Sequence, residues 1–373
     1  MRGDRCHLRA QPPPQARRAI ASSSPWPALP RLALAWALAA ALLGACHEAS
    51  TRAPFTDSRI PPGLQSRFYP PDGWTWGLVQ PGRMPAARYG VSAPSSEARA
   101  DVLILASYGE PAEVWFETAS ELNAKGYVVW VLEPVGQGGS GRYSRLRDLG
   151  YAESLTPDVL AARITAERII HRRPLILMAS GTSASAAIQA LAAGTQAEGL
   201  ILTSPRLSPD DAATQSRAQG MLQRNFGWLR ADLHGGWSRH GQDDLAQGLT
   251  HDPARGRLRL AWQTANPDLR MGTPSWSWIA AFAGAVQAAG TSEPRVSQTV
   301  LVLEPDRAMG SARADCQRMA HCTLQTLPAA DRALELEANP ARAPWIKAVG
   351  DFVEHAISAF APPMADARLA QDG

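Results

Sequence analysis

A cysteine near the start of the chain has the setting of a residue that receives a lipid. A segment containing arginines precedes an uninterrupted apolar run over residues 32–43, and Gly44 and Ala45 then lead to Cys46. A charged region, a short apolar region and small residues before a cleavage site are typical of a signal peptide, and this run is too short to span a membrane. We therefore predict that residues 1–45 are removed and that Cys46 carries the lipid. The alternative is an N-terminal anchor that is never cleaved.

This leader predicts a protein of the bacterial cell envelope that faces the periplasm and is held at a membrane by its N-terminal lipid. The residue after Cys46 is His47 and not an aspartate retention signal, which favours the outer membrane. Residues 46–67 contain many Pro, Ser, Thr and Arg residues without an apolar period and are expected to form a tether. The folded part would then begin near Phe68.

Export also bears on the remaining cysteines. Cys6 belongs to the leader, whereas Cys316 and Cys322 lie six residues apart, at an expected helix end and an expected strand start. In an oxidising compartment this pair predicts a disulfide, and two buried thiols are the alternative. The cysteine and histidine spacings predict no metal site, and no cofactor is expected.

The charge of the chain argues against nucleic acid as a partner. The whole sequence has a net charge of +3, but the first 45 residues hold six arginines and one acid, so the mature chain has 31 basic and 33 acidic residues and a net charge of −2. No basic tract remains that could neutralise a row of phosphates. Arginine outnumbers lysine 35 to 2, so a single arginine carries little functional information.

Short apolar runs alternate with helical segments from Phe68 onward. The runs expected to form buried strands are residues 102–105, 127–132, 175–178, 200–203 and 300–303, and a last strand is expected at residues 323–327. Helices are expected at residues 110–125, 157–171 and 344–360, with an Ala-rich helix between the third and fourth runs. This alternation predicts the α/β class, with a doubly wound, mostly parallel sheet covered by helices on both faces.

The alternation stops at Pro205. Residues 206–295 are polar, rich in tryptophan and helical in period, without a buried-strand run. We expect them to form an inserted helical cap, which divides the core into residues 68–205 and 296–361 and leaves residues 362–373 as a tail.

Two stretches resemble motifs of a known family. Residues 133–142, Glu-Pro-Val-Gly-Gln-Gly-Gly-Ser-Gly-Arg, resemble an acidic-x-x-Gly-x-Gly-x-Ser turn, and residues 250–255 and 266–278 resemble the cap of bacterial lysophospholipase-like proteins. From about residue 68 to residue 360 the chain is similar to α/β-hydrolases of the lysophospholipase and monoacylglycerol lipase branch, also described as serine aminopeptidase-like. This resemblance implies the α/β-hydrolase fold and hydrolysis of carboxylic esters by a Ser-His-Asp triad.

The resemblance implies a nucleophile on a sharp strand-to-helix turn flanked by small residues. Aligned without a gap, the nucleophile position is Gly181, which has no nucleophilic side chain. A shift of two residues gives Gly-Thr-Ser-Ala-Ser and makes Ser183 the candidate nucleophile, with a helix N-cap as its alternative role. Ser180 is the poorer candidate because Met178 would lie at the crowded position before it.

The resemblance also implies positions for the acid and the base. Asp306, after the strand at residues 300–303, matches the acid, and Glu304 is the less favoured choice. The base position after the last strand is Arg332, and an arginine stays protonated and cannot act as a general base. Five histidines are alternatives for the base, and none lies at the implied position: His321 precedes the last strand, His355 lies in the closing helix, and His234, His240 and His251 belong to the cap.

Backbone N–H groups of the turn after Leu105 are expected to face the oxyanion, with Tyr108 as the contributor.

Two hypotheses about function follow from these positions. One is an envelope esterase or lysophospholipase that uses Ser183, Asp306 and a base from elsewhere, such as a cap histidine. The other is a catalytically inactive relative whose cleft binds a lipid, a small ester or a partner. The direction of the Ser183 hydroxyl distinguishes them.

Overall fold

The computed structural model describes residues 53–143, 148–169, 172–207, 225–232, 234–239, 249–306 and 312–360. The predicted signal peptide, Cys46, His240 and the predicted tail lie outside the described residues. Within the described part, no helix is both long enough and apolar enough to cross a membrane.

Eight described strands form one sheet in the order β1-β2-β4-β3-β5-β6-β7-β8. Their bounds are β1 Thr75–Val79, β2 Ala87–Ser92, β3 Ala100–Leu105, β4 Tyr127–Leu132, β5 Leu175–Ser180, β6 Gly199–Thr203, β7 Thr299–Pro305 and β8 Cys322–Leu327. Strand β2 pairs antiparallel with β1 and β4, and the strands from β4 to β8 pair parallel. Five apolar runs of the sequence lie in β3, β4, β5, β6 and β7, because strands covered on both faces need apolar residues at consecutive positions. Residues 323–327 lie in the edge strand β8, where Leu327 is the one buried residue.

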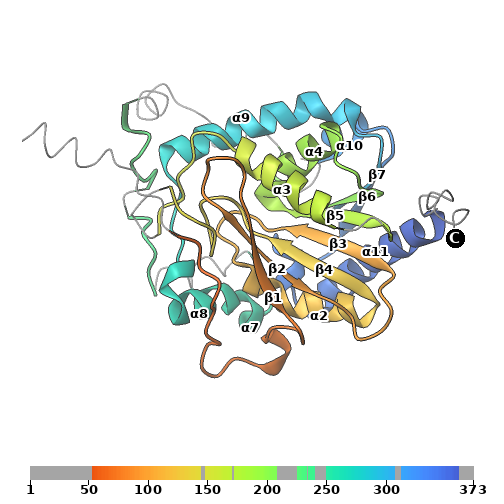
Figure 1. Cartoon of the computed structure of the whole chain (residues 1–373), viewed down its shortest axis with the longest axis horizontal. Coiled ribbons are helices and arrows are strands. Elements are labelled where there is room, and N and C mark those ends of the chain that lie inside the picture. Colours follow the sequence, from red (N-terminus) through yellow and green to blue (C-terminus); the bar gives the residue numbers. More distant parts are fainter. Residues whose placement is uncertain are drawn as a thin grey trace, which may run out of the picture. The chain divides into compact units, whose positions relative to one another are not determined.

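Helices cover both faces of the sheet (Figure 1). The described α-helices are α2 Phe116–Ala124, α3 Thr156–Arg168, α4 Ala184–Ala192, α7 Pro253–Gly256, α8 Leu258–Ala265, α9 Trp276–Ser292, α10 Arg313–Arg318 and α11 Asn339–Ala359. Alternate side chains of one strand enter different cores: Leu177 packs in the core of α3 and α4, and Met178 in the core of α2 and α11. The fold is therefore a doubly wound α/β sheet.

Part of the predicted cap belongs to the layers of the core. Helix α9 lies along α4 (Figure 1), and the Gln189 side-chain amide donates to the carbonyl oxygen of Ala285 at 3.2 Å. On α8, Leu258 and Trp262 are buried in the same core as Phe116, whose ring centroid lies 5.5 Å from that of Trp262. The buried residues of α8 and α9 include large side chains such as Trp262 and Phe282. They recur at helical spacing among polar residues, so the polar composition of residues 206–295 as a whole did not reveal this packing.

The sequence predicted that the folded part begins near Phe68, but residues ahead of Phe68 already pack against the domain. The Phe55 N–H donates to the Gly139 carbonyl oxygen at 2.7 Å. Further on, the Arg59 N–H donates to Asn266 Oδ1 at 2.7 Å, and Asn266 Nδ2 donates back to the Arg59 carbonyl oxygen at 2.9 Å. The side-chain amide of Asn266 thus mimics a strand partner, so residues 55–59 of the predicted tether are fixed along the domain.

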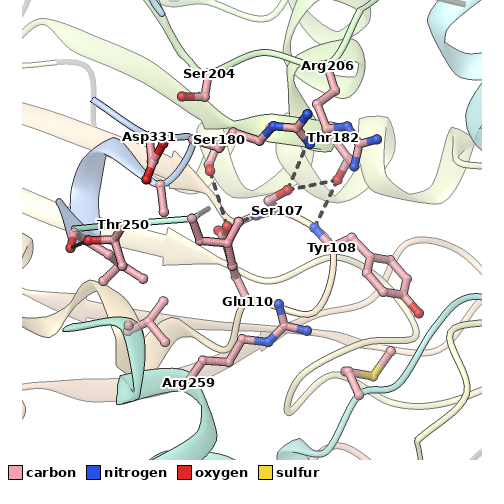
Figure 2. A pocket seen from close by; sticks show the side chains of 18 of the residues that line it. Ser107, Tyr108, Glu110, Ser180, Thr182, Ser204, Arg206, Thr250, Arg259 and Asp331 are labelled. Carbon is pink, nitrogen blue, oxygen red and sulfur yellow. Dashed lines mark hydrogen bonds between the residues drawn. The ribbon is translucent and has the colours of Figure 1, made fainter. Parts of the chain in front are cut away.

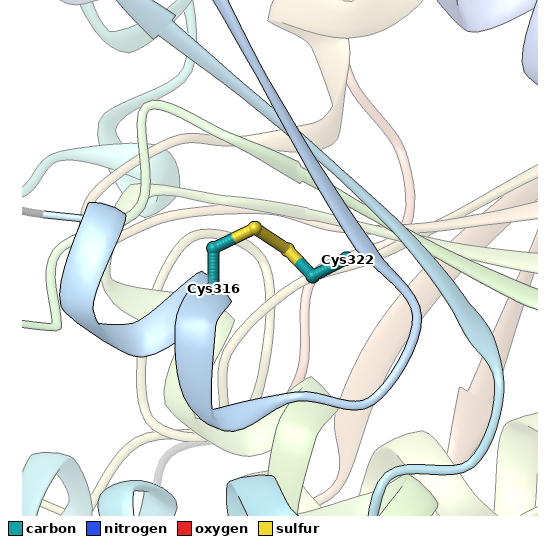
Figure 3. The surroundings of a disulfide bond; sticks show 2 residues. All are labelled: Cys316 and Cys322. Atoms are coloured by element: carbon teal, nitrogen blue, oxygen red, sulfur yellow. A yellow bond between two sulfur atoms is a disulfide. The ribbon is translucent and has the colours of Figure 1, made fainter.

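Cys316 on α10 and Cys322 at the start of β8 are joined by a disulfide (Figure 3). Their Cα atoms are 5.3 Å apart, within the usual range for such a bond. The bond ties α10 to the edge strand of the sheet.

Candidate functional site

A cavity of about 1030 Å³ opens where the parallel strands end. Its walls come from the segments after β3, β5, β6, β7 and β8 and from the inserted residues 249–274. Figure 2 shows its centre, where the turn after β3 meets the turn after β5. The polar lining residues used below are Ser107, Tyr108, Glu110, Ser180, Thr182, Arg259, Glu304, Asp331, Arg332 and Glu335. In an open parallel sheet, ligands bind at this carboxyl edge.

The turn after β5 contains Gly181 at its sharpest point. Its φ is +47°, a left-handed conformation that side chains other than glycine's rarely adopt. A Cβ atom at this position would lie 2.5 Å from Ser107 Oγ. The backbone thus keeps the sharp strand-to-helix turn that the resemblance implies, while the space beside Gly181 is taken by the Ser107 hydroxyl.

Ser183, the candidate nucleophile of the shifted alignment, points away from the cavity. The 3-10 turn Gly181–Ser183 carries it behind the elbow, where its hydroxyl donates to the Ala106 carbonyl oxygen at 2.5 Å. Ser183 is not among the residues that line the cavity. Its hydroxyl ties the start of α4 to the end of β3, which is a structural role.

The two backbone N–H groups best placed to face an oxyanion already have acceptors. The Tyr108 N–H donates to Thr182 Oγ1 at 3.0 Å, and the Thr182 N–H donates to Ser107 Oγ at 3.1 Å (Figure 2). The two hydroxyl oxygens are 3.2 Å apart and share a hydrogen bond. We call this closed set of Ser107, Tyr108 and Thr182 the hydroxyl lock. The predicted contributor Tyr108 thus lies at the cavity with its N–H group occupied by the protein itself.

The predicted acid and base positions lie after neighbouring strands, β7 and β8. Asp306 Oδ2 accepts a hydrogen bond from the Ala329 N–H at 3.2 Å, so the acid position contacts the loop that carries Arg332. Arg332 is exposed and lines the cavity, whereas Asp306 is not a lining residue. The structure therefore brings Asp306 and the Arg332 loop together but turns Ser183 away from them.

A cap histidine reaches the loop after β8. His251 Nδ1 lies 2.9 Å from Glu337 Oε1, and His251 Nε2 lies 3.5 Å from Oδ2 of Asp331, the residue before Arg332. Ligand atoms of these three residues lie within 4.8 Å of one another, a spacing that could hold a metal ion. The Glu337 carboxylate, however, also accepts hydrogen bonds from the N–H groups of Asp331 and Ala338, so it works as a loop anchor. Among the other described histidines, His321 and His355 are exposed outside the cavity, and His234 lies exposed at its rim.

Three glutamates line the cavity floor, and sequence reasoning did not anticipate Glu110 and Glu335 there. Ser180 Oγ donates to Glu110 Oε1 at 3.5 Å, and Glu110 Oε2 accepts from the Ser107 N–H at 2.8 Å. Burial raises the pKa of Glu110 and raises that of Glu335 further, where the negative charge of Glu110 adds to the effect. Glu304, the less favoured acid, is also buried at this floor. Glu110 and Glu335 do not lie in a recognisable motif, because their surroundings depend on long-range packing.

The glycine-rich turn after β4 holds the turn after β3 in place. Glu133, its acidic residue, accepts hydrogen bonds from the Ala112 and Gly139 N–H groups at 2.7 Å each and from Arg88 Nε at 2.9 Å. Arg88 is fully buried between Glu133 and Glu113. This network fixes the turn after β3, on which Ser107 and Tyr108 stand, so the family-like motif has a positioning role.

Comparison with known proteins agrees with this architecture. The family model described as serine aminopeptidase, S33, matches residues 96–321. The chain belongs to this family. No curated protein sequence matches the chain. Solved structures of similar fold include a monoglyceride lipase from Saccharomyces cerevisiae, which is 14% identical with a TM-score of 0.60 and matches 76% of this chain and 96% of its own. A monoacylglycerol lipase from Paleococcus ferrophilus is 13% identical with a TM-score of 0.56, and the match covers 71% of this chain and 98% of that chain. A carboxyl esterase from Bacillus coagulans is 15% identical with a TM-score of 0.58, and the match covers 76% of this chain and 99% of that chain. At these identities the likeness establishes the α/β-hydrolase fold.

Proposed function

We propose that this chain is a lipid-anchored protein of the cell envelope whose cavity binds an acyl lipid or a small ester without hydrolysing it through a serine triad. The observation that carries the proposal is the hydroxyl lock. Acyl transfer needs free N–H donors at the position where the oxyanion forms, and here both N–H groups are bound to side-chain oxygens.

The residues at the triad positions support the same conclusion. Gly181 supplies no nucleophile, and Arg332 cannot accept a proton at physiological pH. The Ser183 hydroxyl is bound to the Ala106 carbonyl oxygen on the far side of the elbow. A protein without nucleophile, base and free oxyanion donors retains only what binding alone provides.

The cavity supports ligand binding. Its volume of about 1030 Å³ exceeds what a small polar metabolite needs and suits a molecule with a headgroup and a chain. Two proteins of similar fold were crystallised with a bound small molecule, the yeast lipase with a substrate analog and the bacterial esterase with glycerol. The predicted lipid on Cys46 would hold the cavity near a membrane, where amphiphilic ligands concentrate.

The first test is covalent labelling of the full chain with a fluorophosphonate, next to a serine hydrolase that has an intact triad. We expect no labelled protein and no turnover of short-chain esters. Stoichiometric labelling would contradict the proposal. Loss of the label in Ser183→Ala or in Ser180→Ala would then identify the nucleophile.

The second test is calorimetric binding of three probes that share an eight-carbon chain: octanoate, octyl phosphate and 1-monooctanoylglycerol. We expect at least one of them to bind with a stoichiometry of one and to be recovered intact. Leu260 lines the cavity, so Leu260→Trp should weaken binding by narrowing it. The matched substitution Leu78→Trp, at a partly exposed position on β1, should leave binding unchanged. Failure of all three probes to bind would refute the proposal.

A further inference from the structure

One charged side chain in the cavity has no hydrogen-bonded partner. Arg259 stands in the first turn of α8 and extends toward Glu110 (Figure 2). Among the residues that the structure describes, none accepts a hydrogen bond from its guanidinium group, and its Nε atom is buried. Arginine presents five N–H donors in a fixed fork, so this group enters the cavity with its donors unused by the protein.

Glu110 is the acid that faces Arg259, but its oxygens are engaged elsewhere. They accept hydrogen bonds from the Ser107 N–H and the Ser180 hydroxyl. Burial lowers the pKa of Arg259, and the negative charge of Glu110 offsets this effect only in part. The hydroxyl of the neighbouring Tyr108 is also engaged, because it donates to the Gly272 carbonyl oxygen at 3.0 Å.

The backbone makes room for this guanidinium. Gly109 has a φ of +67°, and a Cβ atom there would lie 2.6 Å from Arg259 Nη2. The position of Gly109 is fixed by its own N–H, which donates to Gln137 Oε1 at 2.8 Å. A side chain at residue 109 would displace the arginine, so the turn after β3 and helix α8 are shaped together around a cation that faces the cavity.

We propose that Arg259 binds the anionic oxygens of the ligand, a carboxylate or a phosphate headgroup, while the chain of that ligand occupies the rest of the cavity. This inference rests on the proposed function and adds the chemical class of the headgroup. A planar guanidinium suits either group because each offers two oxygens at the spacing of its N–H donors.

The test uses the three eight-carbon probes with the full chain. Octanoate and octyl phosphate should each bind about tenfold or more tightly than neutral 1-monooctanoylglycerol, as expected for a charge-assisted hydrogen bond in a water-poor cavity. Arg259→Gln should remove this difference by weakening only the anionic probes. Arg259→Lys should retain part of it. The matched control is Arg257→Gln, which removes an exposed arginine two residues away and should change nothing. The ratio of the octanoate and octyl phosphate affinities then tells which headgroup the site prefers.

Other outcomes separate this inference from the proposed function. If the neutral probe binds as tightly as the anionic ones, or if the preference persists in Arg259→Gln, the cavity still binds ligands but Arg259 is not the anchor. If no probe binds, both proposals fail. Thermal unfolding provides a readout that does not need a ligand: Arg259→Gln should unfold at the same temperature as the parent chain or higher, whereas a marked decrease would show that Arg259 is a structural ion-pair partner of Glu110.

Discussion

Placing a serine at position 181 should destabilise the protein, and a second substitution should recover part of the lost stability. In Gly181→Ser the new residue must adopt a φ of +47°, and its Cβ atom would lie 2.5 Å from Ser107 Oγ. The Ser107 hydroxyl cannot rotate away without releasing the Thr182 N–H, which it accepts at 3.1 Å. Backbone strain and the loss of a buried hydrogen bond therefore occur together.

The magnitudes follow from these two terms. A left-handed backbone costs a residue other than glycine about 1–2 kcal/mol, and a buried N–H without a partner costs about 1–3 kcal/mol. We expect Gly181→Ser to lower the free energy of unfolding by about 2–5 kcal/mol, the sum of the two. Ser107→Ala alone should cost about 1–3 kcal/mol, since it also leaves the Thr182 N–H unpaired. Both single variants leave the Thr182 N–H unpaired, and the double variant bears this cost only once. We therefore expect a favourable coupling energy of about 1–3 kcal/mol between the two substitutions.

The coupling energy is measured by urea unfolding of four proteins: the parent chain, Gly181→Ser, Ser107→Ala and the double variant. Gly194 offers a matched control, because its φ is +91° and nothing lies within 4 Å of a Cβ built there. Gly194→Ser should show only the backbone term and no coupling to Ser107→Ala. The reasoning is refuted if Gly181→Ser costs no more than Gly194→Ser, or if its coupling to Ser107→Ala is within about 0.5 kcal/mol of zero.

Four further outcomes are expected. Cys46→Ala should give an uncleaved precursor that incorporates no palmitate and does not partition into detergent; unchanged labelling would exclude this cysteine. Replacing Cys316 and Cys322 with serine should lower the free energy of unfolding by about 2 kcal/mol, because the closed loop is short, and two freely alkylated thiols in the parent chain would rule out the bond in the exported protein. Burial raises the pKa of Asp158 to about 7, so the parent chain should lose stability relative to Asp158→Asn as the pH rises from about 4 through 7. If the difference in unfolding free energy between the two chains is the same at pH 4 and pH 8, this prediction is wrong. Arg332→His alone should produce no esterase activity, and measurable turnover would reveal a nucleophile in the parent chain.

Most of the sheet could be predicted from the sequence because parallel strands are buried on both faces. Val102 and Ile104 face one helical layer, and Leu103 and Leu105 face the other, so the run has no polar position. Such a run marks a strand even in a single sequence. The bounds of elements that depend on tertiary packing were less accurate, as with α11, which begins at Asn339 instead of near residue 344.

The site was harder to predict because its features depend on contacts between distant segments. Gly181 and Arg332 could be placed from the resemblance, since they occupy known positions in the order of the strands. The lock between Ser107 and Thr182 joins residues 75 positions apart, and neither residue lies in a motif that predicts the other. The unpaired state of Arg259 has no sequence signal in a chain that contains 35 arginines. Periodicity predicts which face is buried, but not which hydroxyl or guanidinium remains available.

In the proposed function, the glycine at position 181 and the occupied N–H donors are two parts of one local structure. Ser107 Oγ can approach the Gly181 backbone only because no Cβ atom stands there, and in that position it accepts the Thr182 N–H. Thr182 Oγ1 in turn accepts the Tyr108 N–H, which closes the set. A side chain at position 181 would push the Ser107 hydroxyl out and release the Thr182 N–H, while Thr182 Oγ1 would still accept the Tyr108 N–H. For this reason no single substitution at the base position can restore a triad, whereas Gly181→Ser with Ser107→Ala would supply a hydroxyl and a free Thr182 N–H together.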